Sequence, residues 1–575
     1  MRGAVKYDNY THCLTINAKA VQPVSAHEIA QVPKLTLQPV YRLSRGIDAE
    51  DLRHRIQVAL AQTPLPDDPL PAKVKRRYGL VDLKIALKQI HFPETETELE
   101  AARQRLVFDE FFYLHLALLL HRGRTPVAPG RPLKLELLGQ FQANLPFTLT
   151  QAQQRVIVDI LDDLAQPFPM NRLVQGDVGS GKTVVAVAAC LAVIAQGHQA
   201  ALMAPTETLA EQHYHKVKGW LKPLGMTTAL LMGATRAKAR RALLADLASG
   251  QIDLVVGTHA LVSANVTYAN LGLAVIDEQH RFGVKQRNAL VAKGPNPHLL
   301  SMTATPIPRT LALALHQDVD VSLIDELPPG RKAIITQVLG PEGQGQVQRL
   351  VKLQLAMGFQ AYVVLPLVER STDGEVKSAQ EAYAQYQQAF ADYQVGLLHG
   401  RMTTQAKSKA LNAFRAGQSQ ILVSTTVIEV GVDVPKATVM VVEQAERFGL
   451  AQLHQLRGRV GRSGDQSYCL LIDGAGTAAS QERLSILAQH QDGFKIAEAD
   501  LQMRGAGEVL GQKQTGIPQF ALADLVKDRD LLPLAHSAAR GAVAKGERLQ
   551  CWPRLLAEAQ RRGHLERALH QPHLN

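Results

Sequence analysis

Cysteine is scarce and scattered in this 575-residue chain. The four cysteines, Cys13, Cys190, Cys469 and Cys551, form no CxxC pair and lack the spacing that metal ligands show. A disulfide framework or a zinc site needs closer or more regular cysteines. The sequence therefore argues against both and indicates a reducing compartment.

Long apolar runs are absent as well. The N-terminal MRGAVKYDNY lacks the apolar core of a signal peptide. The longest apolar run, FFYLHLALLL from Phe111, is too short to span a bilayer. We therefore expect a cytoplasmic protein that has no membrane partner.

A dense block of lysine and arginine is also missing, although the formal net charge is +11. Positive charge that is spread along the chain suits a polyanion contacted over an extended surface. It suits a basic protein without such a partner about equally well. Charge alone does not decide between the two.

The length of the chain predicts several domains, each with its own core. Short β-like runs occupy the first forty or so residues, and apolar residues at helical spacing extend from Ile47 to about Arg122. The Pro/Gly-rich stretch TPVAPGRP then breaks the pattern. These changes predict a β-rich segment at residues 1–35 and a helical region at 36–132.

Beyond this break, short apolar runs alternate regularly with amphipathic helices, and the rhythm restarts after DELPPGRK at residues 325–332. Such alternation is typical of parallel sheets covered by helices. We predict an α/β fold with two doubly wound domains joined by a Pro/Gly hinge. The expected boundaries are 133–325 and 326–480 for these domains and 481–575 for a C-terminal helical region.

The strongest local motif is GDVGSGKT at residues 176–183, which fits the pattern GxxxxGK[ST] between the strand NRLVQ and the helix TVVAVAACLAVIA. Its glycines let backbone N–H groups close around phosphate oxygens at a helix N-terminus, and Lys182 and Thr183 would reach the phosphates and Mg²⁺. A chance glycine turn is the competing interpretation, and the flanking strand and helix argue against it. The residues predicted to bind ATP are Gly176, Asp177, Val178, Gly179, Ser180, Gly181, Lys182 and Thr183.

An acidic pair follows a later apolar strand, in LAVIDEQH. Asp277 would hold the Mg²⁺ shell, and Glu278 would orient and deprotonate the attacking water. By itself, an Asp-Glu pair after a strand is usually a solvated loop. Together with the phosphate loop upstream, the pair favours catalysis.

Arginines in HQLRGRVGRSG supply the cations that a transferring phosphoryl group needs. Arg459 and Arg462 are three residues apart and so share one face of a turn or helix, with Gln455 nearby. We interpret them as arginine fingers supplied by the second domain. A basic surface patch would also contain arginines, but glycine-punctuated arginines suit close approach to phosphate better than they suit a plain helix.

These three sets of residues resemble superfamily 2 helicases and translocases, in which two RecA-like domains clamp ATP. The resemblance implies ATP and Mg²⁺ as cofactors, adenine reading by Gln153 in LTQAQ, and nucleotide contact by Gly431 and Asp433. It also implies that APTETLAEQH and GTHA contact the nucleic-acid strand. The residues to which it assigns coupling or DNA contact are Gln279, His280, Thr303, Thr305, Thr425, Thr426 and Gln455.

Longer segments narrow the resemblance to the RecG family of bacterial branched-DNA translocases: DEQHRFGVKQR, MTATPIPRTLA, DELPPGRK and RGAGEVLGQKQTG. The last segment resembles the TRG element, shared with the transcription-repair coupling factor Mfd, and makes Arg504 and Gln514 its residues to test. The resemblance implies an ATP-dependent double-stranded DNA translocase or helicase that remodels stalled forks and Holliday junctions in recombination and repair. It further implies a nucleoid-associated bacterial monomer, with a single-stranded-DNA-binding protein as a candidate partner.

The chain departs from this family in two ways. Ala506 stands where the family usually has proline. The resemblance implies a wedge barrel of the oligonucleotide-binding type ahead of the motor, and residues 1–35 resemble a remnant of it. Only a few dozen residues precede the segment LQPVYRL, and a piece of that size cannot close such a barrel. We therefore expect a chain shortened at its N-terminus, and such a truncated motor could be deficient in branch binding.

Three competing functions differ from this one at the motifs. An Mfd-like translocase usually carries DEEQ, and a DEAD-type RNA helicase carries DEAD, where this chain has DEQH. A non-catalytic module would have a damaged phosphate loop or would lack the arginines. Those residues are present here, which favours an active motor.

Overall fold

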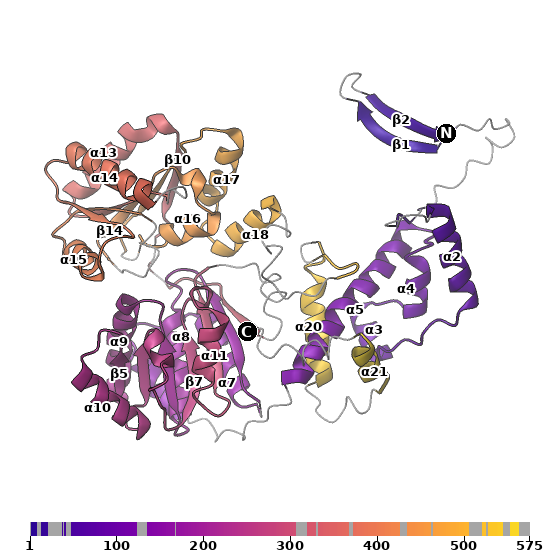
Figure 1. Ribbon diagram of the computed structural model, residues 1–575, viewed down its shortest axis with the longest axis horizontal. Coiled ribbons are helices and arrows are strands. Elements are labelled where there is room, and N and C mark those ends of the chain that lie inside the picture. Colours follow the sequence, from indigo (N-terminus) through magenta and orange to yellow (C-terminus); the bar gives the residue numbers. More distant parts are fainter. Residues whose placement is uncertain are drawn as a thin grey trace. The chain divides into compact units, whose positions relative to one another are not determined.

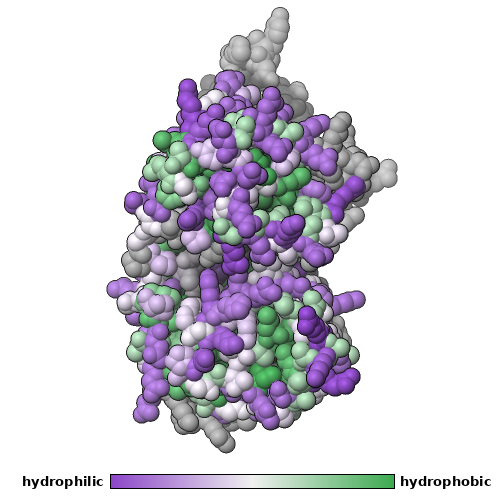
Figure 2. Space-filling view, turned by 90° about the vertical axis from the view of Figure 1, so that its left-hand side faces the viewer, coloured by the Kyte–Doolittle hydropathy of each residue, from purple (hydrophilic) through white to green (hydrophobic). Residues whose placement is uncertain are grey.

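The computed structural model describes residues 2–8, 13–20, 37, 39–41, 48–122, 135–166, 168–305, 319–328, 330, 332–366, 372–425, 434–461, 464–504, 520–524, 527–543 and 553–562. It divides into two compact units, Met1–Asp109 and Glu110–Asn575. In the part of the chain that the structure describes, no helix combines the length and the apolar character that crossing a bilayer needs. Figure 2 shows one face of the molecule, on which hydrophilic residues predominate and hydrophobic residues form separate patches.

The first unit begins with an antiparallel pair of strands, β1 (Arg2–Asp8) and β2 (Cys13–Ala20). Helices follow, as the apolar spacing of this region predicts. They are α2 (Ala49–Gln62), α3 (Ala72–Tyr78), α4 (Leu83–Gln89) and the first half of α5 (Glu96–Arg122). The side chains of Asp48 and Asp82 cap α2 and α4 by accepting hydrogen bonds from backbone N–H groups of the first turn.

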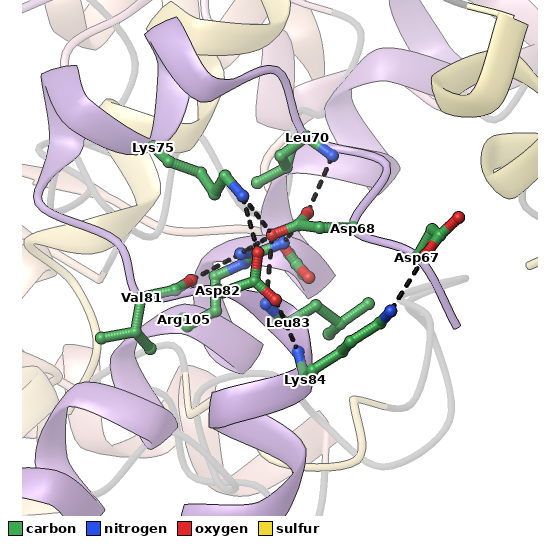
Figure 3. Close-up of polar contacts among 10 residues, drawn as sticks. Asp67, Asp68, Leu70, Lys75, Val81, Asp82, Leu83, Lys84 and Arg105 are labelled. Atoms are coloured by element: carbon green, nitrogen blue, oxygen red, sulfur yellow. Dashed lines mark hydrogen bonds and ion pairs between the residues drawn. The ribbon is translucent and has the colours of Figure 1, made fainter. Parts of the chain in front are cut away.

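A buried network of charges joins these helices (Figure 3). The fully buried guanidinium of Arg105 on α5 donates to both carboxylate oxygens of Asp68, at 2.8 and 2.7 Å, and to Asp109 at 3.0 Å. Lys75 on α3 bonds Asp68 and Asp82, each at 2.9 Å. Burial would raise the pKa of Asp68, but the hydrogen bonds from Arg105 and Lys75 hold it well below its usual range. The loop before α3 is thus tied to α5 by ionised groups.

A parallel sheet, in which Figure 1 labels β5 and β7, forms the first half of the second unit. Its strand order among the described residues is β5-β6-β4-β7-β8-β3-β9. Its strands are β3 (Asn171–Gly176), β4 (Gln199–Met203), β5 (Thr228–Leu231), β6 (Leu254–Gly257), β7 (Leu271–Ile276), β8 (His298–Thr303) and β9 (Asp320–Ile324). The accompanying helices are α6 (Leu135–Ala143), α7 (Gln151–Leu164), α8 (Lys182–Ile194), α9 (Glu207–Leu221), η1 (Lys222–Leu224), α10 (Ala237–Ala248), η2 (His259–Val262), η3 (Gln279–Arg281) and α11 (Val284–Val291).

Both faces of this sheet are covered, because alternate residues of each strand point to opposite sides. Ala200 and Leu202 of β4 join one core with α7, α8 and α9. Ala201 and Met203 join a second core with α10 and α11. Strands buried on both faces read as continuous apolar runs, which explains the pattern in the sequence.

A second parallel sheet follows, in the order β10-β15-β14-β11-β13-β12 among the described residues. Its strands are β10 (Ile335–Leu339), β11 (Gln360–Val364), β12 (Val395–Leu398), β13 (Ile421–Ser424), β14 (Ala437–Val442) and β15 (Tyr468–Ile472). Its helices are η4 (Pro341–Gly343), α13 (Gln344–Ala356), α14 (Thr372–Ala389), α15 (Thr404–Arg415), η6 (Ala445–Arg447), α16 (Leu450–Arg457) and α17 (Ala478–Gln489). The prediction of two helix-covered parallel sheets is confirmed.

The two sheets share one topology. Taken in chain order, β10 to β15 occupy the places of β3 to β8, and β9 is the additional strand of the first sheet. Each sheet separates two apolar cores. We call the two halves domain 1 and domain 2.

The C-terminal helices are α18 (Gly493–Arg504), α20 (Leu531–Val543) and α21 (Pro553–Arg561). Helix α18 packs against α16, and its Ile496 joins a core of domain 2. The second half of α5 contacts α20, where the rings of His115 and His536 lie 4.9 Å apart. The guanidinium of Arg562 stacks 4.4 Å above the Tyr113 ring.

Candidate functional site

The loop GDVGSGKT connects β3 to α8, as its motif predicts. Gly179 and Gly181 have φ angles of 81° and 85°, which disfavour other residues. A Cβ atom at Gly176 would clash with the Ser180 hydroxyl, and one at Gly181 would clash with the Gln153 amide. The backbone therefore turns tightly enough to present N–H groups to an anion at the start of α8.

Lys182 folds back onto this loop. Its ammonium donates to the carbonyl oxygens of Gly176 and Asp177, at 2.8 and 2.9 Å. Desolvation lowers the pKa of Lys182, and the nearby carboxylates of Glu278 and Asp277 oppose this shift. These carbonyl oxygens carry only partial negative charge, and a bound phosphate would offer the Lys182 ammonium a full negative charge.

The hydroxyl of Ser180 is fully buried and has no hydrogen-bond partner among the described residues. Thr183 follows Lys182 in the first turn of α8 and is half-buried. Backbone N–H groups, an ammonium and two hydroxyls suit a triphosphate with its Mg²⁺.

Asp277 follows β7 and is nearly buried. Its Oδ2 lies 2.8 Å from Nε2 of His213, and its Oδ1 accepts from the Glu278 backbone N–H at 3.1 Å. Burial would raise the pKa of Asp277, but the bond to His213 and the charge of Lys182 lower it, so the carboxylate is ionised. An ionised carboxylate held next to the phosphate loop suits a Mg²⁺ ligand.

His213 was not singled out by the motifs, which assign its segment to the nucleic-acid strand. It lies among the buried residues of α9, at helical spacing from Ala210, Val217 and Leu221. That spacing is visible in the sequence. Its partner Asp277, 64 residues further along the chain and just after β7, cannot be recognised in the sequence.

Glu278 has a φ angle of 51°, in the left-handed region where residues other than glycine are strained. Its Oε2 accepts from the backbone N–H of Ala304 at 3.1 Å. Strained backbone that persists at Glu278 indicates that the surrounding structure fixes the orientation of this carboxylate. The acid is thereby connected to the segment after β8.

The end of β8 and the residues just after it hold the predicted coupling hydroxyls. Thr303 Oγ1 accepts from the Thr305 backbone N–H at 3.1 Å, and Thr305 Oγ1 lies 3.5 Å from Nδ1 of His280. Gln279, which begins η3, is nearly buried beside them. These four residues, all predicted to serve coupling or DNA contact, therefore lie close to Glu278 in the chain or in space.

Helix α16 brings domain 2 to the same place. Gln455 donates to Thr305 Oγ1 at 2.7 Å, and His454 Nε2 lies 2.6 Å from Asp177 Oδ1. A Cβ atom at Gly458 would lie 2.7 Å from that of Val178, so α16 contacts the loop directly. Arg459 is nearly buried, and its charge acts on the pKa of Lys182.

Gln153 joins the loop to α7. Its Oε1 accepts from the Thr150 backbone N–H at 2.9 Å, and its Nε2 donates to the Ser180 carbonyl at 2.8 Å. A cavity of about 410 Å³ lies just before α7, lined by Gln142, Ala143, Leu145, Pro146, Phe147, Thr148, Leu149 and Gln154. The adenine-reading role of Gln153 stays a prediction.

Several predicted site residues cannot be placed at the site. Thr425 follows β13, fully buried, with its backbone N–H bonded to the Leu398 carbonyl at 3.2 Å. Arg504 ends α18, but its side chain lies outside the described part of the chain. The residues that lie wholly outside it are Thr426, Gly431, Asp433, Arg462 and Gln514, together with Ala506.

Comparison with known proteins identifies the family. Family models match residues 150–313 (DEAD/DEAH box helicase), 345–464 (helicase conserved C-terminal domain) and 490–555 (ATP-dependent DNA helicase RecG, domain 3, C-terminal). The ATP-dependent DNA helicase RecG of Bacillus subtilis is 44% identical over 533 residues, which are 91% of this chain and 78% of that protein. The chain belongs to the RecG family.

Two further RecG proteins illustrate the extent of the match. The RecG of a Synechocystis strain is 53% identical over 521 residues, 90% of this chain. The chain spans 63% of the length of that relative. A solved structure described as RecG bound to a three-way DNA junction is 41% identical, with a TM-score of 0.64 over 92% of this chain and 70% of the other. The resemblance to RecG is therefore confirmed.

Proposed function

We propose that this chain is an ATP-dependent double-stranded DNA translocase or helicase that remodels branched DNA, such as stalled forks and Holliday junctions, in recombination and repair. The observation that carries the proposal is the meeting of three elements: the phosphate loop, the pair Asp277 and Glu278, and helix α16 of domain 2. A structural relative is described as bound to a three-way DNA junction, which supports branched DNA as the substrate.

The loop residues would hold the phosphates of ATP, with Lys182 moving from its carbonyl partners to the β- and γ-phosphates. Thr183 and Asp277 would hold Mg²⁺, and His213 would keep the Asp277 carboxylate in place. When bound, Mg²⁺ withdraws charge from the phosphate oxygens.

Glu278 would orient the attacking water and accept its proton. Arg459 and Arg462, supplied by domain 2, would stabilise the charge that develops on the transferring phosphoryl group. Gly431 and Asp433 would complete the nucleotide contacts from the same domain. Hydrolysis therefore needs both domains together.

The bonds Glu278–Ala304 and Thr305–Gln455 would transmit the state of the site to domain 2. Thr425 and Thr426 would contact the DNA backbone, and Arg504 and Gln514 would link domain closure to DNA movement. Because phosphate contacts dominate such binding, its affinity should fall steeply with salt. We further propose that a monomer acts at the bacterial nucleoid, with a single-stranded-DNA-binding protein as a partner.

ATP hydrolysis measured with forked, linear duplex and single-stranded DNA and with RNA tests this function. Turnover should rise most with forked DNA. Stimulation by RNA alone would reject a DNA motor, and equal stimulation by linear and forked duplex would reject branch specificity while keeping the motor.

A substitution in the loop tests the site. Lys182→Ala should abolish turnover and leave DNA binding largely intact, because the ammonium contacts phosphate rather than DNA. Lys238→Ala, on the exposed first turn of α10, is the matched control and should hydrolyse ATP normally. Survival of turnover in Lys182→Ala would remove the loop from the site.

A further inference from the structure

His454 joins the two domains at the phosphate loop. It lies on α16 of domain 2 and is 2% exposed. Its Nε2 lies 2.6 Å from Oδ1 of Asp177, the second residue of the loop in domain 1. Its Nδ1 lies 2.9 Å from a guanidinium nitrogen of Arg457. Both ring nitrogens are therefore engaged.

The neighbours of His454 determine where its proton lies. A guanidinium has only donors, so Nδ1 accepts the hydrogen bond from Arg457. The proton of the neutral imidazole is then on Nε2, which donates to the Asp177 carboxylate. Arg457 is itself fixed by the carbonyl oxygens of Leu487, His490 and Gln491, at 2.6, 2.8 and 2.9 Å. The imidazole thus has one preferred orientation and one preferred tautomer.

The hydrogen bond from His454 stabilises the charge of Asp177. Desolvation would raise its pKa, but hydrogen bonding to His454 and to the Val178 backbone N–H lowers it, so a negative charge sits in a loop built for phosphate. Both donors meet the same oxygen, Oδ1, the Val178 N–H at 2.6 Å. Without His454, the charge would lose a fixed donor and the carboxylate could turn toward the phosphate position.

We propose that His454 is a positioning residue of the nucleotide site, which holds Asp177 and lets domain 2 set the shape of the phosphate loop. The proposal rests on ATP binding at that loop, the function proposed above. The loop accepts phosphate best while α16 is docked on it, through His454 and the neighbouring packing of Gly458 on Val178. Separation of the domains breaks the bond and weakens the hold on nucleotide.

The test uses the full chain and the fluorescent nucleotide mant-ADP. His454→Ala should bind mant-ADP about tenfold more weakly, the usual effect of losing one hydrogen bond to a charged group. KM for ATP should rise to the same extent with forked DNA, while kcat stays within about twofold, because Glu278 and Arg459 are untouched. Hydrogen exchange at residues 176–182 should become faster.

Two variants separate positioning from general damage. His454→Gln keeps an N–H donor near the place of Nε2 and should recover most of the mant-ADP affinity. In Asp177→Asn, the added His454→Ala should have little further effect, because the two residues act as a pair. His215→Ala, exposed on α9, is the control and should bind as the unchanged chain does.

The outcomes are distinct. Unchanged mant-ADP affinity in His454→Ala, or an undiminished effect in the Asp177→Asn background, would overturn the positioning role while the ATPase function stands. If His454→Ala does not fold, His454→Gln and Asp177→Asn still decide. A loss of mant-ADP affinity in His454→Gln as large as that in Asp177→Asn would contradict the proposal. Absence of mant-ADP binding and of DNA-stimulated turnover in the unchanged chain would instead reject the proposed function.

Discussion

Asp277 and His213 show how one residue of the site depends on another that carries no motif. The imidazole lies 2.8 Å from the carboxylate and is nearly buried with it. A carboxylate that binds metal needs such a partner to fix its orientation. His213 thus supports Asp277.

His213→Ala should lower ATP hydrolysis about ten- to a hundredfold and raise the Mg²⁺ concentration needed for half-maximal turnover, because Asp277 loses its fixed orientation. Steady-state ATPase assays over a Mg²⁺ series measure both. His215→Ala, two positions further along the same helix, is the matched control. An unchanged Mg²⁺ dependence in His213→Ala would show that the histidine only fills space.

Single residues also show what the sequence could predict. The motif residues Lys182, Asp277 and Glu278 were found because their spacing and flanking apolar runs are local. The bonds His213–Asp277 and His454–Asp177 join residues 64 and 277 positions apart, and nothing local specifies them. The left-handed backbone of Glu278 likewise depends on its surroundings, and the sequence does not signal it because the position is not a glycine.

At the scale of helices, the charges around Arg105 join helices that apolar packing alone holds weakly. Helices α2 and α3 contain no fully buried residue, so apolar packing fixes them weakly. Asp68, Lys75 and Arg105 join α3 to α5 instead. Buried charges of this kind are costly when one partner is removed.

Arg105→Met should destabilise the helices of the first unit by about 3–5 kcal/mol, because Asp109 would lose the guanidinium and Asp68 would keep only Lys75 as a cation. Hydrogen exchange of α3 and α5 measures the loss. Arg55→Ala removes an exposed pair with Asp51 and should cost less than about 0.5 kcal/mol. The triple variant that adds Asp68→Asn and Asp109→Asn should recover much of the stability; failure to recover would mean that shape, rather than charge, is at stake.

The contact between α5 and α20 should depend on pH. Burial, helped by the charge of His536, lowers the pKa of His115 from 6.5 to about 3. The unfolded chain then binds more protons than the folded chain between these values, so stability is complete above pH 6.5 and falls toward pH 3, by up to about 1.4 kcal/mol per pH unit. Hydrogen exchange of α20 at pH 7.5 and 5.5, corrected for its intrinsic rate, should show this loss.

His115→Leu should remove this part of the pH dependence, because leucine fills a similar space and does not titrate. His215→Leu is the control and should keep it. Burial also lowers the pKa of His298, to about 4, which adds pH dependence of the same sign to both variants. The contribution of His115 is therefore the difference between His115→Leu and His215→Leu. Equal pH dependence in both chains would contradict the assignment to His115.

Over the whole molecule, the two domains repeat one arrangement. RFGVKQ at 281–286 and RFGLAQ at 447–452 both follow a left-handed residue, Glu278 or Gln444, and both start a helix capped by its glutamine. The loops after β3 and β10 read GDVGSGKT and GPEGQGQV. Gln346 and Val347 stand in domain 2 where domain 1 has Lys182 and Thr183.

The second loop differs in conformation too. Gly345 lies inside α13, whereas Gly181 has a φ angle of 85°, and Pro341 has no N–H to offer. Domain 2 therefore lacks the anion-binding geometry of domain 1. The apolar pattern of the sequence predicts the parallel topology of both sheets. The difference in conformation between the two loops is recognised only from their backbone angles.

Titration of the full chain with mant-ADP should give one bound nucleotide per chain, because the loop at 176–183 has the required geometry and the equivalent loop of domain 2 lacks it. Lys182→Ala should remove that binding. Gln346→Ala, at the equivalent place in domain 2, should leave it unchanged. A stoichiometry of two, with one site lost in Gln346→Ala, would assign a second nucleotide to domain 2.

The docking of α16 on the phosphate loop has a kinetic consequence. The phosphate loop and Arg459 belong to one polypeptide, so their encounter is intramolecular. The effective concentration of one at the other is set by the chain that joins them. Dilution does not alter that concentration. Each chain would therefore complete the proposed site by itself, without a collision with another copy.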